Sequence, residues 1–124
     1  MAIEELLYKD LTYKLRGIFF KTYKELGRGL NENIYRNALV VELEKNKIAY
    51  KKEIEIPVFY ENIKVGKQRI DLLVDERIIL ELKATPKLHH ESIKQLLFYL
   101  KATDIKLGIL VNFGDKLEIK RYIN

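Results

Sequence analysis

The stretch RIDLLVDERIILELKA, residues 69–84, reads as two apolar strands joined by a polar turn. Isoleucine, leucine and valine fill both halves, and the run Asp75-Glu76-Arg77 separates them. Each half nevertheless carries charge where a buried strand is expected to be apolar. Asp71 lies in the first half, and Glu81 and Lys83 lie in the second. The role of these three charges is the question that the sequence raises.

The length of the turn predicts how the two strands pair. Side chains alternate between the two faces of a strand, and facing residues of an antiparallel hairpin have a constant sum of residue numbers. A loop of three residues, 75–77, places Val74 opposite Ile78. The same register sets the charged residues of the two strands opposite one another: Asp71 with Glu81, and Arg69 with Lys83.

Two facing carboxylates repel each other when both are ionised, because their Cβ atoms would lie about 4.5–5.5 Å apart. A divalent cation such as Mg²⁺ offsets this repulsion, since hard ions bind carboxylate oxygens and keep positions for water and phosphate. Lys83 cannot be a ligand while protonated, but it can orient an attacking water or stabilise a phosphoryl group. The competing interpretation is a salt-bridge patch, in which Arg69 and Lys83 neutralise the two carboxylates. Spacing alone leaves both interpretations open.

The composition predicts one domain, residues 1–124, because 124 residues with 48% hydrophobic content can bury one core. The chain has no cysteine, which excludes disulfides and Cys-ligated zinc. A net charge of +5 favours polyanionic partners only weakly, and solvated helix faces explain it equally well. The start MAIEELLYKD lacks the basic residues of a signal peptide, and no apolar run is long enough to span a membrane. We therefore expect a cytoplasmic protein without membrane contact.

Hydrophobic periodicity predicts two helices before the hairpin and one after it. The first ends near the glycines of LGRGL and carries a series of apolar residues: Leu7, Leu11, Leu15, Ile18, Tyr23 and Leu26. The second begins at the N-cap Asn31 and places three side chains on its apolar face: Ile34, Ala38 and Val41. The third, roughly 88–102, has an apolar side of four leucines: Leu88, Leu96, Leu97 and Leu100.

Alternating patterns predict five strands. The first, around 54–60, contains Pro57 and is therefore expected at a sheet edge. Two strands follow at about 65–74 and 78–83, and after the third helix come KLGILVNF and KLEIKRYI, joined by a turn at Gly114-Asp115. The helix between the third and fourth strands makes these two parallel. We expect a three-layer α/β/α domain with a mixed five-stranded sheet in the order α-α-β-β-β-α-β-β.

An Asp in one strand, followed by Glu-x-Lys in the next and then a helix and a strand, resembles the PD-(D/E)XK nuclease superfamily. More narrowly, GLNENIY resembles the motif of the bacterial and archaeal GxxExxY proteins, with Gly29, Glu32 and Tyr35 in the defining positions. RIDLLV, LELKA and QLLFYL follow in the family order, so that the resemblance covers about residues 12–121. The Pro that commonly precedes the Asp is replaced by Ile70. The resemblance implies a restriction-endonuclease-like fold.

The resemblance also implies a catalytic centre. It assigns a Mg²⁺ or Mn²⁺ ion to three carboxylates: Glu32, Asp71 and Glu81. Lys83 takes the position of the family's catalytic lysine, and Gln95 that of the helix glutamine that positions substrate or water. Without the family, Gln95 would be interpreted as a solvated surface residue.

Three further residues are expected to contact the substrate: Tyr35, Arg69 and Tyr99. Tyr99 follows Gln95 by four residues and shares its helical face. Tyr35 can hold the carboxylate of Glu32, although a packing role for its ring fits the sequence equally well. Arg69 is one of the basic residues expected near the substrate backbone.

The function implied is metal-dependent hydrolysis of phosphodiester bonds in nucleic acid, with DNA as the substrate class on family grounds. The competing hypothesis is a non-catalytic module that binds nucleic acid or protein on the same fold. A structural subunit of a larger assembly is a third hypothesis. A homo-oligomer or a protein partner that supplies specificity is compatible with all three.

Overall fold

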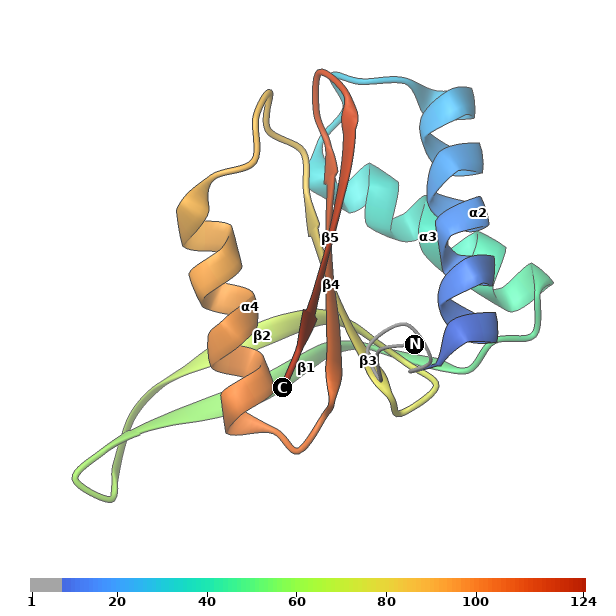
Figure 1. Ribbon diagram of the computed structural model, residues 1–124. Coiled ribbons are helices and arrows are strands. Elements are labelled where there is room, and N and C mark those ends of the chain that lie inside the picture. The colour runs from blue at the N-terminus through green and yellow to red at the C-terminus, as the bar shows by residue number, and fades with distance from the viewer. Residues whose placement is uncertain (1–7) are drawn as a thin grey trace.

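The computed structural model describes residues 8–124, so that Leu7, expected in the first helix, lies outside the described residues. These residues form three helices and a five-stranded sheet in the predicted order (Figure 1). The helices are α2 (Lys9–Leu26), α3 (Glu32–Lys45) and α4 (His90–Ala102). The strands are β1 (Tyr50–Tyr60), β2 (Ile63–Val74), β3 (Ile78–Lys83), β4 (Leu107–Phe113) and β5 (Leu117–Ile123).

The sheet has the strand order β1-β2-β3-β4-β5, and only the β3–β4 pair is parallel among its neighbours. This arrangement confirms the crossover predicted from the helix between these strands. β1 lies at the edge, as Pro57 predicted. Val74 faces Ile78, so that the three-residue turn sets the predicted register.

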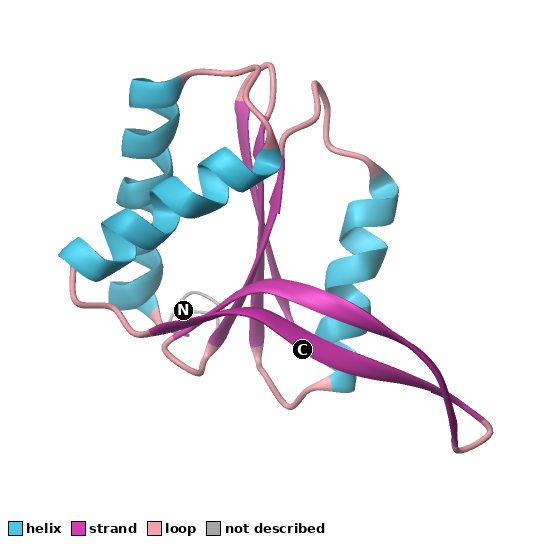
Figure 2. Cartoon of the chain, turned by 180° about the vertical axis from the view of Figure 1, so that it is seen from behind, coloured by secondary structure: helices cyan, strands magenta, loops and turns pink. Residues whose placement is uncertain are grey.

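Helices cover both faces of the sheet, with α2 and α3 on one side and α4 on the other (Figures 1 and 2). The larger core lies under α2 and α3, and the smaller one lies under α4. Every residue of β4 is buried because both of its faces are covered. At Gly108 a Cβ atom would lie 2.8 Å from Leu96 Cδ1, so that α4 packs closely on this strand.

All three predicted helix faces are wrong in part. On α3 the buried residues are Tyr35, Leu39 and Leu43, whereas Ile34 and Val41 are 40% and 52% exposed. The helix buries the i, i+4, i+8 series that contains the large ring of Tyr35. The apolar series of the other two helices each contain one exposed residue: Leu26 on α2 and Leu97 on α4. On α4 the ring of Tyr99 is buried, because it faces β2.

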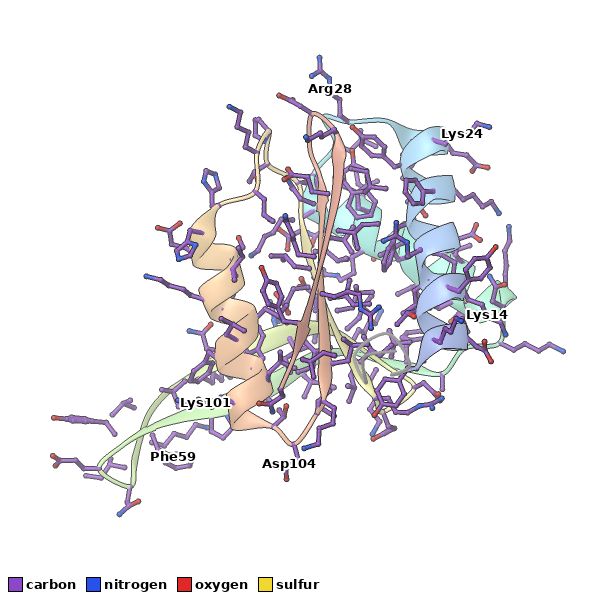
Figure 3. All side chains as sticks on the ribbon, in the orientation of Figure 1. Lys14, Lys24, Arg28, Phe59, Lys101 and Asp104 are labelled. Carbon is purple, nitrogen blue, oxygen red and sulfur yellow. The ribbon has the colours of Figure 1, made fainter. Side chains whose placement is uncertain are left out.

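The β1–β2 hairpin projects out of the sheet. Near residues 70–74 it packs on the core, but every residue from 63 to 69 is exposed, and the hairpin extends beyond α4 (Figure 2). Four large apolar side chains gather near its tip: Phe59, Tyr60, Ile63 and Val65. Figure 3 places Phe59 on this distal part, away from the helices. None of the helices between residues 8 and 124 is long and apolar enough to span a membrane.

Candidate active site

The β2–β3 pairing opens at the two carboxylates that the sequence placed opposite each other. Backbone pairing runs from Val74–Ile78 to Leu72–Leu80, and the next facing positions are Asp71 and Glu81. There the backbone N–H of Asp71 donates to Glu81 Oε1 at 3.0 Å. The N–H of Leu82 donates to Asp71 Oδ2 at 2.9 Å. Side-chain oxygens therefore accept the hydrogen bonds at the point where the strands separate.

Burial and mutual repulsion define the electrostatics of this pair. Glu81 is 2% exposed, and the side chain of Asp71 is 14% exposed. Burial, followed by the negative charge of Asp71, raises the pKa of Glu81 to about 8. The hydrogen bond from the Asp71 amide and the positive charge of Lys83 oppose this rise. A cation between the carboxylates would favour the ionised form of Glu81.

Lys83 and Gln95 form a hydrogen bond beside the carboxylates. Lys83 Nζ, at the end of β3, donates to Gln95 Oε1 on α4 at 3.2 Å. This hydrogen bond restricts the ammonium group and leaves further N–H groups for other acceptors. The structure therefore brings together Asp71, Glu81, Lys83 and Gln95.

Tyr99 is not an accessible substrate contact, contrary to the sequence prediction, because its side chain is buried. Its hydroxyl donates to the backbone carbonyl of Arg69 at 2.9 Å and so ties α4 to β2, two residues before Asp71. Burial, followed by the charges of Glu81 and Asp71, raises the pKa of Tyr99 to about 12. Tyr99 therefore remains a neutral donor that supports the strand carrying Asp71.

The first turns of α3 approach the carboxylate pair from the other layer. Burial and then the charge of Asp71 raise the pKa of Glu32, while the charges of Lys83 and Arg36 lower it. Arg36 places Nη1 3.5 Å from Asp71 Oδ1 and Nη2 3.5 Å from Glu53 Oε1, with only 15% of its side chain exposed. The sequence analysis missed Arg36. Its position four residues after Glu32, on the same helical face, is the signal that could have identified it.

The donor atoms are suitable for a magnesium ion, although they do not form a complete protein cage. Within residues 8–124, no three His, Cys, Asp or Glu side chains are arranged to hold a metal ion. Mg²⁺ is commonly bound by one or two carboxylates together with waters and substrate phosphates. Asp71 and Glu81 fit that donor set, because each carboxyl group uses one oxygen for a backbone amide and has a second one, which on Asp71 lies 3.5 Å from Arg36 Nη1. Glu32 as a third ligand stays a prediction.

Tyr35 lies in the core and not at the site, so that its expected substrate contact is wrong for this structure. Its side chain is buried, and its ring stacks on Phe113 with centroids 4.4 Å apart. The hydroxyl donates to the carbonyl of Gly27 at 2.5 Å and accepts from the amide of Leu30 at 3.4 Å. Tyr35 therefore fastens the α2–α3 connection, and it does not hold Glu32.

Arg69 differs from the two tyrosines, because its side chain is 62% exposed and accessible to a substrate. Its nearest ion-pair contact is Glu53, at 4.0 Å. The competing interpretation, a salt-bridge patch in which Arg69 and Lys83 neutralise the two carboxylates, does not describe the ion pairs of this structure. The cation that pairs with Asp71 comes from Arg36, and Lys83 is hydrogen-bonded to Gln95.

Comparison with known proteins agrees with this fold. The crystal structure titled "Crystal structure of SSO0001" is similar to 75% of this chain and 50% of its own, with a TM-score of 0.57. The present chain thus spans about half the length of that protein. At 23% sequence identity the similarity concerns the fold alone. No curated protein matches the sequence. The profile of the PD-(D/E)XK nuclease superfamily matches residues 9–122, and the chain belongs to this superfamily.

Proposed function

We propose that this protein hydrolyses phosphodiester bonds in nucleic acid with the help of Mg²⁺ or Mn²⁺, and that DNA is its substrate. Membership of a nuclease superfamily supports the reaction class. The observation that carries the proposal is the carboxylate pair of the buried Glu81 and the partly buried Asp71, beside the ammonium group of Lys83. The narrower assignment to the GxxExxY proteins, based on Gly29, Glu32 and Tyr35, is part of the same proposal.

We assign the following roles to the side chains of the site. Asp71 and Glu81 would hold a divalent cation, which would supply Lewis acidity to the scissile phosphate and to the attacking water. Lys83 donates hydrogen bonds to that water or to the phosphoryl oxygens as negative charge develops. Gln95 positions the ammonium group of Lys83 through its side-chain oxygen. Arg69, exposed two residues before Asp71, is placed to contact a flanking phosphate.

Cleavage assays on three DNA forms test the proposal. Plasmid, linear duplex and single-stranded DNA are incubated with the protein in Mg²⁺, in Mn²⁺ or in EDTA. We expect cleavage with a metal and none in EDTA, and we expect Glu81→Gln to abolish it. Cleavage that survives in EDTA or in Glu81→Gln would contradict the proposed centre.

A non-catalytic binding module is the second candidate, and one observation favours it. Without a cation the pair is already partly compensated: Arg36 lies against Asp71, and the raised pKa keeps Glu81 largely protonated at neutral pH. The fold can therefore tolerate both carboxyl groups without metal. Wild-type protein that binds DNA but cleaves none of the three forms, with either metal, would decide for the binding module.

A further inference from the structure

A groove lies beside the candidate active site, between α4 and the β1–β2 hairpin. Its volume is about 440 Å³, and Lys83 forms part of its wall. Gln68 lines it from the hairpin, and Lys94, Gln95 and Phe98 line it from α4. Figure 2 shows the hairpin passing beside this helix before it projects into solvent. A chain that occupied the groove would therefore pass Lys83, whose positive charge acts on Glu81.

The groove combines an aromatic face with hydrogen-bonding groups. Phe98 is 37% exposed, and the edge-to-face contact of its ring with Tyr99 behind it has centroids 6.0 Å apart. Gln68 on the hairpin and Ser92 on α4 add hydrogen-bond donors and acceptors to the groove. A nucleobase matches these groups, because it has a flat π-face and carries donors and acceptors on its edge. Bases stack readily on exposed aromatic side chains.

The groove carries few charges. Two cations, Lys83 and Lys94, lie on its wall with one anion, Glu91. So few cations supply few phosphate contacts to either a single strand or a duplex, and the preference between the two depends on the aromatic ring. The exposed ring of Phe98 is useful only to a base that has left its stack, because the faces of paired bases are covered by their neighbours.

We propose that this groove binds a single nucleic-acid strand and directs it to the carboxylate pair. One base stacks on Phe98, Gln68 contacts a base edge, and a phosphate lies beside Lys94. The delivery of the strand to the carboxylate pair rests on the proposed nuclease function. Binding in the groove does not require cleavage, so binding and cleavage are tested separately.

Binding is measured without metal by fluorescence anisotropy. The probes are a labelled oligothymidine of about 12 nucleotides, within the range of known single-strand site sizes, and a duplex of equal length, both in EDTA. We expect the single strand to bind more tightly. Phe98→Ala should weaken that binding about 5- to 100-fold, as loss of one stacking platform does. The matched control is Phe20→Ala, an aromatic residue that is 52% exposed on α2, and it should leave the affinity unchanged.

A second variant tests the phosphate contact. Lys94→Ala should reduce the slope of log affinity against log salt by about 0.7, the value for one single-strand phosphate. Thermal melting is used to show that both variants are folded. Equal affinities of the folded Phe98→Ala and Phe20→Ala variants would overturn the inference. Tighter binding of the duplex would also overturn it. If the protein binds the strand in the groove but does not cleave it, only the nuclease proposal is overturned. If Phe98→Ala changes neither cleavage nor binding, only the groove proposal is overturned.

Discussion

The amide of Asp71 donates to the carboxylate of Glu81 at 3.0 Å, across the strands that these residues help to separate. In return Asp71 accepts the amide of Leu82 at 2.9 Å. Each acidic side chain therefore has a structural partner as well as a proposed catalytic one. Replacement by Asn or Gln keeps an acceptor oxygen for the amide, whereas Ala leaves it unpaired. Tests of charge at this site should accordingly use the amide variants.

Divalent metal should stabilise the folded protein. If Mg²⁺ or Mn²⁺ binds the native carboxylate pair and not the unfolded chain, mass action adds about 2.7 kcal/mol at 100 times the dissociation constant. Asp71→Asn should lose most of this gain. Asp104→Asn serves as the control, because Asp104 is exposed in the loop between α4 and β4 (Figure 3). The measurement is the thermal midpoint with and without metal, and an undiminished gain in Asp71→Asn would exclude Asp71 as a ligand.

Lys83→Ala should separate turnover from affinity. A group that stabilises developing charge acts mainly in the transition state, so we expect cleavage to fall at least about 100-fold. Binding of nucleic acid in EDTA should change only modestly. Lys24→Ala, on the last turn of α2, is the control for loss of one positive charge (Figure 3). A parallel loss of binding and cleavage in Lys83→Ala would instead identify a binding residue.

Stability without metal should depend on pH through Glu81. Burial raises its pKa from 4.5 to about 8, so the folded chain keeps a proton that the unfolded chain releases above its own pKa. Stability therefore falls as pH rises between these two values and levels off above the higher one. Denaturation midpoints in EDTA across this range should show the decline, and Glu81→Gln should flatten it. Glu61→Gln, at the exposed hairpin tip, should retain the wild-type decline.

Arg36 should act as an internal substitute for the cation. Its guanidinium lies 3.5 Å from Asp71 and compensates the pair when no metal is present. Arg36→Gln should therefore lower the thermal midpoint in EDTA and increase the gain in midpoint on addition of Mg²⁺. Arg28→Gln, which removes an exposed pair with Asp115, provides the comparison. A smaller gain from Mg²⁺ in Arg36→Gln than in wild type would show that Arg36 assists metal binding.

Tyr35→Phe should reduce stability and leave chemistry intact. The variant keeps the ring stacked on Phe113 but removes the hydroxyl that donates to Gly27, at a cost of about 1 kcal/mol. Chemical denaturation measures this cost, and the cleavage rate of the folded variant should equal that of wild type. A selective loss of cleavage at unchanged stability would restore the substrate contact expected from the sequence.

Local patterns in the chain were enough to predict the order of the elements and the register of the central hairpin. Turn length and alternation are local properties, so the three-residue loop sufficed to set Val74 opposite Ile78. The helix between β3 and β4 made these strands parallel, and Pro57 marked an edge. Residues whose roles follow from strand position, Asp71 and Glu81, were therefore found on the strands where they were expected.

The side chains that approach these strands from other layers could not be predicted without the packed fold. Arg36 reaches Asp71, and the rings of Tyr35 and Tyr99 turn inward, because of how α3 and α4 pack on the sheet. Helical periodicity gives several nearly equivalent apolar faces, and the volume of the neighbouring side chains selects one of them. The groove beside Phe98 likewise requires the hairpin to leave the sheet next to α4. Such contacts join residues far apart in the chain, and no local pattern encodes them.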